Sequence, residues 1–230
     1  MKRLLSHTFA AFIALATPAL ADSPVVIELF TSQGCSSCPP ADEMLHALAE
    51  RDDVIALALH VDYWDYIGWK DEFAQAKFSE RQREYAVRGG RRSVYTPQMV
   101  VNGVTDVVGA KPMKLSAAIS AHAATPSPVA VTLERNGNTI TVDAISNGAE
   151  GPFIVQLVRY TAKSETRITR GENAGNTFSY ANVAKDWTIL GEWDGHKPFS
   201  MTADLASDAP VVVILQNETS GPILAAARLR

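Results

Sequence analysis

The sequence has little cysteine and no large excess of charge of either sign. Only 2 of the 230 residues are cysteines, too few for a disulfide-stapled scaffold or a four-thiolate zinc site. Lysine and arginine number 21 against 25 acidic residues, and this formal net charge of −4 argues against nucleic acid as the main partner. Hydrophobic residues make up 47% and charged residues 20%, which excludes a disordered chain.

The sequence also lacks a long hydrophobic run of the kind that spans a membrane, which needs roughly 20 apolar residues. Its first segment instead has the pattern of a secretory signal. A basic start, Met1-Lys2-Arg3, is followed by a short apolar stretch, and Ala19-Leu20-Ala21 fits the small-x-small cleavage rule. We therefore expect a signal peptide at residues 1–21 and a periplasmic or secreted mature protein without stable membrane insertion, in a compartment where disulfides persist.

The mature chain changes character near residue 125. Before it, continuous apolar runs typical of buried strands alternate with segments of helical pattern in the order β-α-β-α-β-β-α. We expect strands at 25–30, 54–61, 98–101 and 104–108, and helices at 39–51, 71–87 and 112–123. The dipeptide Asn102-Gly103 predicts a two-residue hairpin.

A proline-containing linker at 124–128 separates this part from a region of about seven short strands. The sequence therefore predicts an α/β domain at 22–124 and an all-β, sandwich-like domain at 125–230.

Both cysteines lie in one motif, Gly34-Cys35-Ser36-Ser37-Cys38-Pro39, between a buried strand and the start of a helix. A helix N-terminus carries unpaired N–H groups and partial positive charge, which favours the reactive thiolate. We expect Cys35 to be an exposed nucleophile and Cys38 a buried resolving thiol that closes the disulfide. Two alternatives stay open. The pair could be a static staple, although so small a loop removes little chain entropy, or half of a metal site.

A second motif favours redox chemistry. Pro97 stands just before a strand that enters the predicted hairpin, a position that suits a cis peptide bond. There it would lie beside the dithiol, and the backbone of Thr96 would be free to pair with an extended substrate. The alternative is an ordinary trans proline that opens a strand.

Together, the Cys35-Ser36-Ser37-Cys38 motif, Thr96-Pro97 and the Asn102-Gly103 hairpin resemble the thioredoxin fold. More narrowly, the segments at 28–42, 61–64 and 95–100 resemble a family of secreted bacterial proteins of unknown function with a thioredoxin-like core. The resemblance implies a mixed sheet, a redox pair at Cys35 and Cys38, and a cis-proline at Pro97.

The same resemblance suggests that Glu28 is a buried acid under the dithiol that takes a proton from Cys38. Its spacing is a departure, because Glu28 lies seven residues before Cys35, one more than is usual. The alternative for Glu28 is a glutamate paired at the surface.

An aromatic cluster follows the second expected strand. Tyr63 and Trp64, with Thr96, are candidates for binding a polypeptide substrate, and the alternative is packing between neighbouring elements. His60 beside them is a candidate acid–base residue or metal ligand, although capping of the strand end is the simpler role. Arginines of the following helix, Arg81 among them, are expected on a solvated face.

The sequence as a whole predicts an exported thiol–disulfide oxidoreductase that acts on protein or peptide thiols. It needs no bound cofactor or metal, and a membrane redox partner is expected to recycle it. The alternative is a non-catalytic binding module with a thioredoxin-like fold, which uses the cysteines to handle copper or another metal or to hold a partner.

Overall fold

The computed structural model describes residues 23–205 and 207–230, so the predicted signal peptide lies outside the described residues. The elements follow one another along the chain in this order: β1 (Val25–Thr31), α1 (Pro39–Ala49), β2 (Val54–His60), η1 (Asp65–Ile67), α2 (Ala76–Arg88), β3 (Gln98–Val101), β4 (Thr105–Val108), α3 (Pro112–Ala123), β5 (Val129–Asn136), β6 (Thr139–Ser146), β7 (Phe153–Arg167), β8 (Thr177–Trp193), β9 (Phe199–Asp204), β10 (Val211–Asn217) and β11 (Ile223–Leu229).

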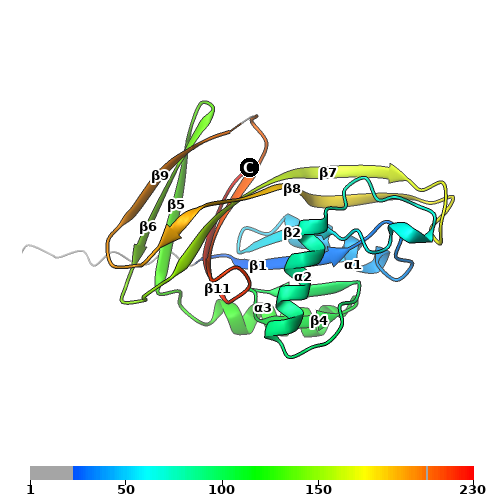
Figure 1. Cartoon of the computed structure of the whole chain (residues 1–230), viewed down its shortest axis with the longest axis horizontal. Helices are drawn as coiled ribbons and strands as arrows, with labels where there is room; N and C mark the ends of the chain where they lie inside the picture. Colours follow the sequence, from blue (N-terminus) through cyan, green and yellow to red (C-terminus); the bar gives the residue numbers. More distant parts are fainter. Residues whose placement is uncertain (1–22, 206) are drawn as a thin grey trace, which may run out of the picture.

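The protein has a mixed α/β fold with a large sheet and a second, smaller one (Figure 1). The large sheet has eight strands in the order β11-β10-β7-β8-β2-β1-β3-β4, and the small sheet has the order β5-β6-β9. Within the described residues, no helix is both long enough and apolar enough to cross a membrane.

The predicted order of elements before residue 124 is confirmed. Strands β1 and β2 are buried along their whole length and pair in parallel, and β3 runs antiparallel to β1. A hairpin joins β3 to β4 at the predicted place, with positive φ at Asn102 (46°) and Gly103 (70°). Its connection has three residues rather than the predicted two, because Val101 pairs with Thr105 and β4 begins one residue later than expected.

Helices cover both faces of this part of the sheet. Leu45 of α1 and Leu115 of α3 pack on one face with Ile27 and Leu29 of β1. On the other face, Phe78 and Tyr85 of α2 pack against the neighbouring residues of β1, such as Phe30. Helix α2 begins at Ala76 rather than at the predicted Asp71, because Asp71 makes the buried polar contacts described below.

The prediction of a self-contained sandwich after residue 124 is wrong, because strands from both parts of the chain share the large sheet. Four strands of the second part, β7, β8, β10 and β11, extend the large sheet, and β8 joins β2 at the parallel pair Ala58 and Val183. Strand β10 and the first half of β7 are buried on both faces, which explains why these stretches are almost continuously apolar.

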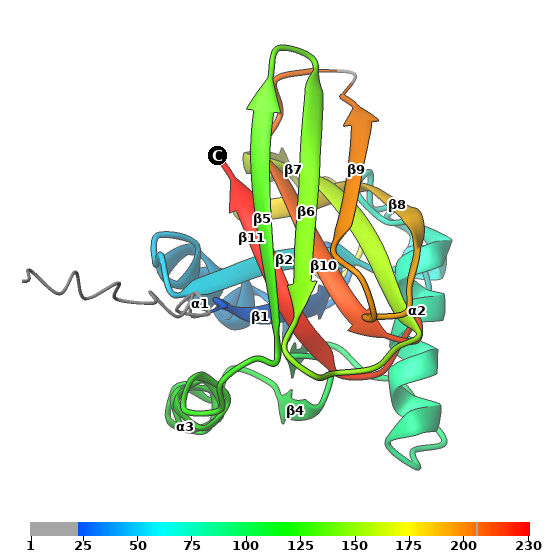
Figure 2. The same ribbon diagram turned by 90° about the vertical axis from the view of Figure 1, so that its left-hand side faces the viewer.

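The small sheet packs on this extension and forms a local sandwich. Ile140 and Val142 of β6 lie in one apolar cluster with Val155 of β7 and Val213 of β10. Figure 2 shows β5, β6 and β9 as a separate layer in front of β10 and β11. The long β7–β8 hairpin runs in the opposite direction, away from this layer and along β1 and β2 (Figure 1).

Candidate functional site: a covered disulfide

Cys35 and Cys38 form a disulfide between the end of β1 and the start of α1, with Cα atoms 5.4 Å apart. Cys38 is the N-cap residue of the helix, and its carbonyl oxygen accepts hydrogen bonds from the N–H groups of Ala41 and Asp42. The N–H of Cys38 donates to the carbonyl oxygen of Cys35 at 3.2 Å. The helix N-terminus therefore lies at the sulfur pair, as the motif predicts.

The expected exposure of Cys35 is wrong. Both cysteines are 0% exposed, whereas Ser36 and Ser37 between them are exposed. The sequence places the pair on a surface loop, but segments from elsewhere in the chain cover the sulfur atoms. An incoming thiol reaches them only after this cover moves.

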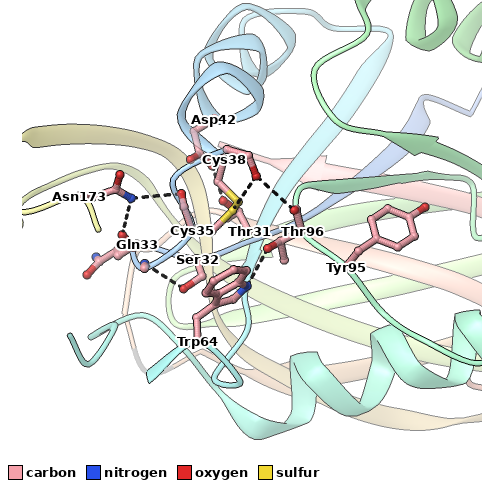
Figure 3. The surroundings of a disulfide bond; sticks show 12 residues. Thr31, Ser32, Gln33, Cys35, Cys38, Asp42, Trp64, Tyr95, Thr96 and Asn173 are labelled. Atoms are coloured by element: carbon pink, nitrogen blue, oxygen red, sulfur yellow. Dashed lines mark hydrogen bonds between the residues drawn. A yellow bond between two sulfur atoms is a disulfide. The ribbon is translucent and has the colours of Figure 1, made fainter. Parts of the chain in front are cut away.

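The turn at Thr96 and Pro97 lies beside the disulfide, and its peptide bond is cis, as predicted (Figure 3). The hydroxyl of Ser37 lies 3.4 Å from Cys35 Sγ and donates to the carbonyl oxygen of Thr96 at 3.5 Å. This oxygen, the predicted pairing point for a substrate backbone, thus has a partner within the chain. The structure brings Cys35, Cys38, Thr96 and Pro97 together.

Of the two aromatic candidates, Trp64 lies at the disulfide and Tyr63 points to a helix. The indole Nε1 of Trp64 donates to Thr96 Oγ1 at 2.8 Å, and Figure 3 shows the ring among the residues that surround the disulfide, near Thr96. The hydroxyl of Tyr63 donates to Gln82 Oε1 on α2 at 3.0 Å. The packing interpretation therefore describes Tyr63, whereas Trp64 is part of the cover.

The residues just before Cys35 are held from both halves of the chain. Gln33 accepts a hydrogen bond from Trp69 Nε1 at 2.8 Å, and its own side-chain amide donates to Thr166 Oγ1 of β7 at 3.3 Å. The side-chain amide of Asn173, at the tip of the β7–β8 hairpin, donates to the carbonyl oxygens of Gln33 and Cys35 at 2.9 and 3.1 Å. Asn173 could not be found from the sequence, because the hairpin tip shows no local pattern that points to the dithiol.

A buried set of ionisable side chains lies beneath this loop. Asp42, one turn into α1 from Cys38, accepts a hydrogen bond from Thr31 Oγ1 at 2.8 Å, and Figure 3 shows it next to Cys38. His60 at the end of β2 pairs through Nδ1 with Asp71 Oδ2 at 2.7 Å, and its buried Nε2 has no hydrogen-bond partner among the described residues. His60 is therefore an interior residue rather than a strand-end cap.

The pKa values of the two carboxyl groups in this set are shifted in opposite directions. Burial raises the pKa of Asp42 to about 7, against the opposing effects of His60 and of the Thr31 hydroxyl. Burial alone would also raise the pKa of Asp71. The His60 side chain and the N–H groups of Gln33 and Phe73 outweigh it, and the pKa of Asp71 is lowered. Asp42 is thus a buried acid near the dithiol that can hold or release a proton near neutral pH.

Glu28 is buried, as the resemblance suggests, but it is paired with a different group. Its carboxylate accepts hydrogen bonds from Arg81 Nε and from the Tyr85 hydroxyl, both at 2.6 Å. Arg81 is buried too, which corrects its expected place on a solvated face, and its guanidinium lies 4.3 Å from the centre of the Trp187 ring. These contacts favour a structural role for Glu28, and its predicted role in proton transfer stays a prediction.

Fold and site together define a mixed α/β protein with a covered C-x-x-C disulfide at a helix N-terminus. The chain belongs to the family described as protein of unknown function (DUF1223), whose model matches residues 26–216.

The chain is similar to two proteins of known structure. It is 32% identical to protein AGR_C_4864 from Agrobacterium tumefaciens, with a TM-score of 0.77 over 92% of this chain and 96% of that one. It shares a fold with HBP35 of Porphyromonas gingivalis at 17% identity, with a TM-score of 0.61 over 90% of this chain and 75% of that one. No protein with a curated description matches the chain.

Proposed function

We propose that the protein is an exported thiol–disulfide oxidoreductase with a thioredoxin-like core, which exchanges the Cys35–Cys38 disulfide with protein or peptide thiols. One observation carries the proposal: the disulfide closes a four-residue loop at the N-terminus of α1, next to the Thr96-Pro97 turn. A staple over so short a loop adds little stability, so redox chemistry explains the pair better than a structural cross-link does.

The exchange consumes one disulfide and forms another. A substrate thiolate attacks one sulfur atom of the pair, the Cys35–Cys38 bond breaks, and the second sulfur leaves as a thiolate. A second substrate thiolate then attacks the mixed disulfide, which releases the oxidised substrate and a protein with two reduced cysteines. The reverse sequence oxidises the protein and reduces a substrate disulfide.

The surroundings of the two sulfur atoms suggest separate roles. Cys35 Sγ lies beside the exposed Ser37 and is the sulfur that an incoming thiolate meets first. Cys38, at the N-cap position, leaves as a thiolate that the helix N-terminus stabilises. Asp42, one turn further on, is the group that supplies or accepts the proton at Cys38.

The complete burial of both cysteines favours a second candidate function, a binding module that does not turn over. In that role the cysteines hold a metal such as copper, or maintain a surface for a partner, and the cover seals the pair. The two functions differ in whether the bonded sulfur atoms exchange with outside thiols while the protein stays folded.

Thiol trapping in glutathione buffers separates the two functions. We expect the folded protein to equilibrate between the disulfide and dithiol forms, and the reduced form to reduce glutathione disulfide or insulin. Cys35→Ser should abolish this activity, and Cys38→Ser should accumulate the mixed disulfide. A pair that exchanges only after unfolding, or thiols that retain stoichiometric copper or zinc, would refute the proposal. If the folded protein does exchange, its measured reduction potential would show whether it acts as an oxidase, a reductase or an isomerase, which share this architecture.

A further inference from the structure

The β7–β8 hairpin reaches the dithiol loop from the second part of the chain and ends there in a single buried amide. Asn173 is only 6% exposed, although its neighbours at the hairpin tip are exposed. Both hydrogen bonds of its amide nitrogen go to main-chain carbonyl oxygens of the loop, those of Gln33 and Cys35. The tip thus contacts one of the two reacting residues directly.

The contact with Cys35 is placed where it controls loop geometry. The carbonyl oxygen of Cys35 accepts one hydrogen bond from the N–H of Cys38 and a second from Asn173. The Asn173 amide therefore fixes the orientation of the Cys35 peptide group, and this peptide group in turn orients Cys38. Because Gln33 is held by the same amide, the chain on the N-terminal side of Cys35 is fixed as well.

We propose that Asn173 is a positioning residue of the Cys35–Cys38 site, through which the second part of the chain sets the stability of the disulfide. The inference rests on the proposed function and extends it to the β7–β8 hairpin. A loop held in this geometry keeps the reduced thiols within bonding distance and raises their effective concentration. Without the amide, the reduced loop samples conformations in which the two sulfur atoms are apart.

Substitution of Asn173 tests the inference through a redox equilibrium. We expect Asn173→Ala to lower the equilibrium constant for disulfide formation by about three- to tenfold, which corresponds to a reduction potential about 15 to 30 mV higher. Asn173→Asp, which keeps the size of the side chain but loses the donor, should shift the potential in the same direction. Each potential is measured by thiol trapping in dithiothreitol buffers, which reduce the pair whether or not glutathione does.

Asn176 offers a matched control at the same hairpin tip. Its exposed side chain donates to the carbonyl oxygen of Asn173 at 3.2 Å, whereas the amide of Asn173 donates to the dithiol loop. We expect the equilibrium constant for disulfide formation in Asn176→Ala to lie within twofold of the parent value. Thermal unfolding of the oxidised variants checks that the substitutions leave the fold intact.

The outcomes are distinct for the two proposals. The positioning role is overturned if the equilibrium constants for disulfide formation in Asn173→Ala and Asn173→Asp lie within twofold of the parent value. This holds even if the parent exchanges readily with glutathione. Equal shifts in Asn173→Ala and Asn176→Ala overturn it too, because they would reflect a general disturbance of the tip. A parent protein that reacts with dithiothreitol but with no other thiol refutes the proposed function, and the Asn173 shift is still read from the dithiothreitol equilibrium.

Discussion

Asp42 makes the stability of the oxidised protein depend on pH, and the substitution Asp42→Asn should remove this dependence. Burial raises the pKa of Asp42 to about 7 in the folded protein, against the ordinary value of 3.8 that the carboxyl group has in the unfolded chain. A raised folded-state pKa means that the folded protein keeps the proton over a range in which the unfolded chain loses it. Ionisation then favours the unfolded chain, so the free energy of unfolding falls as pH rises from about 4 to about 7 and levels off above that.

The size of the effect follows from the difference between the two pKa values. About three pKa units at 1.36 kcal/mol each give a loss of about 4 kcal/mol between the two ends of this range. The pKa of Asp71 is lowered, so its ionisation has the opposite effect on the free energy of unfolding. That effect is confined to pH values below about 4, outside the range in which Asp42 acts. Asparagine can still accept the Thr31 hydrogen bond, so Asp42→Asn keeps the local contact and loses only the ionisable group.

Urea unfolding of the oxidised protein between pH 4 and pH 8 measures this difference directly. We expect Asp42→Asn to flatten the profile and to be more stable than the parent at pH 8. Glu43→Gln is the matched control, because Glu43 is the exposed neighbour of Asp42 on α1 and its neutralisation should leave the slope unchanged. A parent profile that does not fall between pH 4 and pH 7 more steeply than that of Asp42→Asn would refute the argument.

Two further predictions concern Glu28 and Trp64. Glu28→Gln leaves the Arg81 guanidinium buried without its charged partner, so we expect a loss of about 3 kcal/mol or more in urea unfolding. The rate at which the mixed disulfide resolves should stay unchanged, and a slowed resolution would restore Glu28 to the proton-transfer step. Trp64→Phe removes the bond to Thr96 but keeps an aromatic ring, and we expect about fivefold faster reduction by dithiothreitol. Tyr63→Phe, whose hydroxyl bonds to Gln82 instead, should reduce at the parent rate, and equal rates in all three proteins would show that Trp64 does not limit access.

Sequence predicted the parts of the site that depend on local chemistry. The apolar runs of β1 and β2, the proline that starts α1 and the Asn102-Gly103 turn each specify their own conformation within a few residues. A C-x-x-C motif between a strand and a helix therefore had to lie at a helix N-terminus. The position of Pro97 in a cis peptide bond was likewise predicted from its place before β3.

The cover over the disulfide could not be predicted, because it depends on contacts between distant segments. Residues 161–167 of β7 are mainly polar and exposed, so they lack the apolar pattern of a buried strand and give no sign of the long β7–β8 hairpin. Without the hairpin, nothing brought Asn173 to the dithiol, and Cys35 was expected to be exposed. Asp42 and His60 were also hard to assign, since burial of an acid or an imidazole depends on the elements that later pack around it.

The cover and the positioning amide affect different properties of the same disulfide. Opening the cover breaks the Trp64–Thr96 bond, at a cost of about 1 kcal/mol. Such a cover slows oxidation and reduction equally, since it opens for both, and therefore leaves the potential unchanged. Asn173 differs because its bonds fix the loop that holds the sulfur atoms together, so its loss changes the equilibrium itself. Rates that change without the potential identify the cover, and a potential that changes identifies the positioning contact.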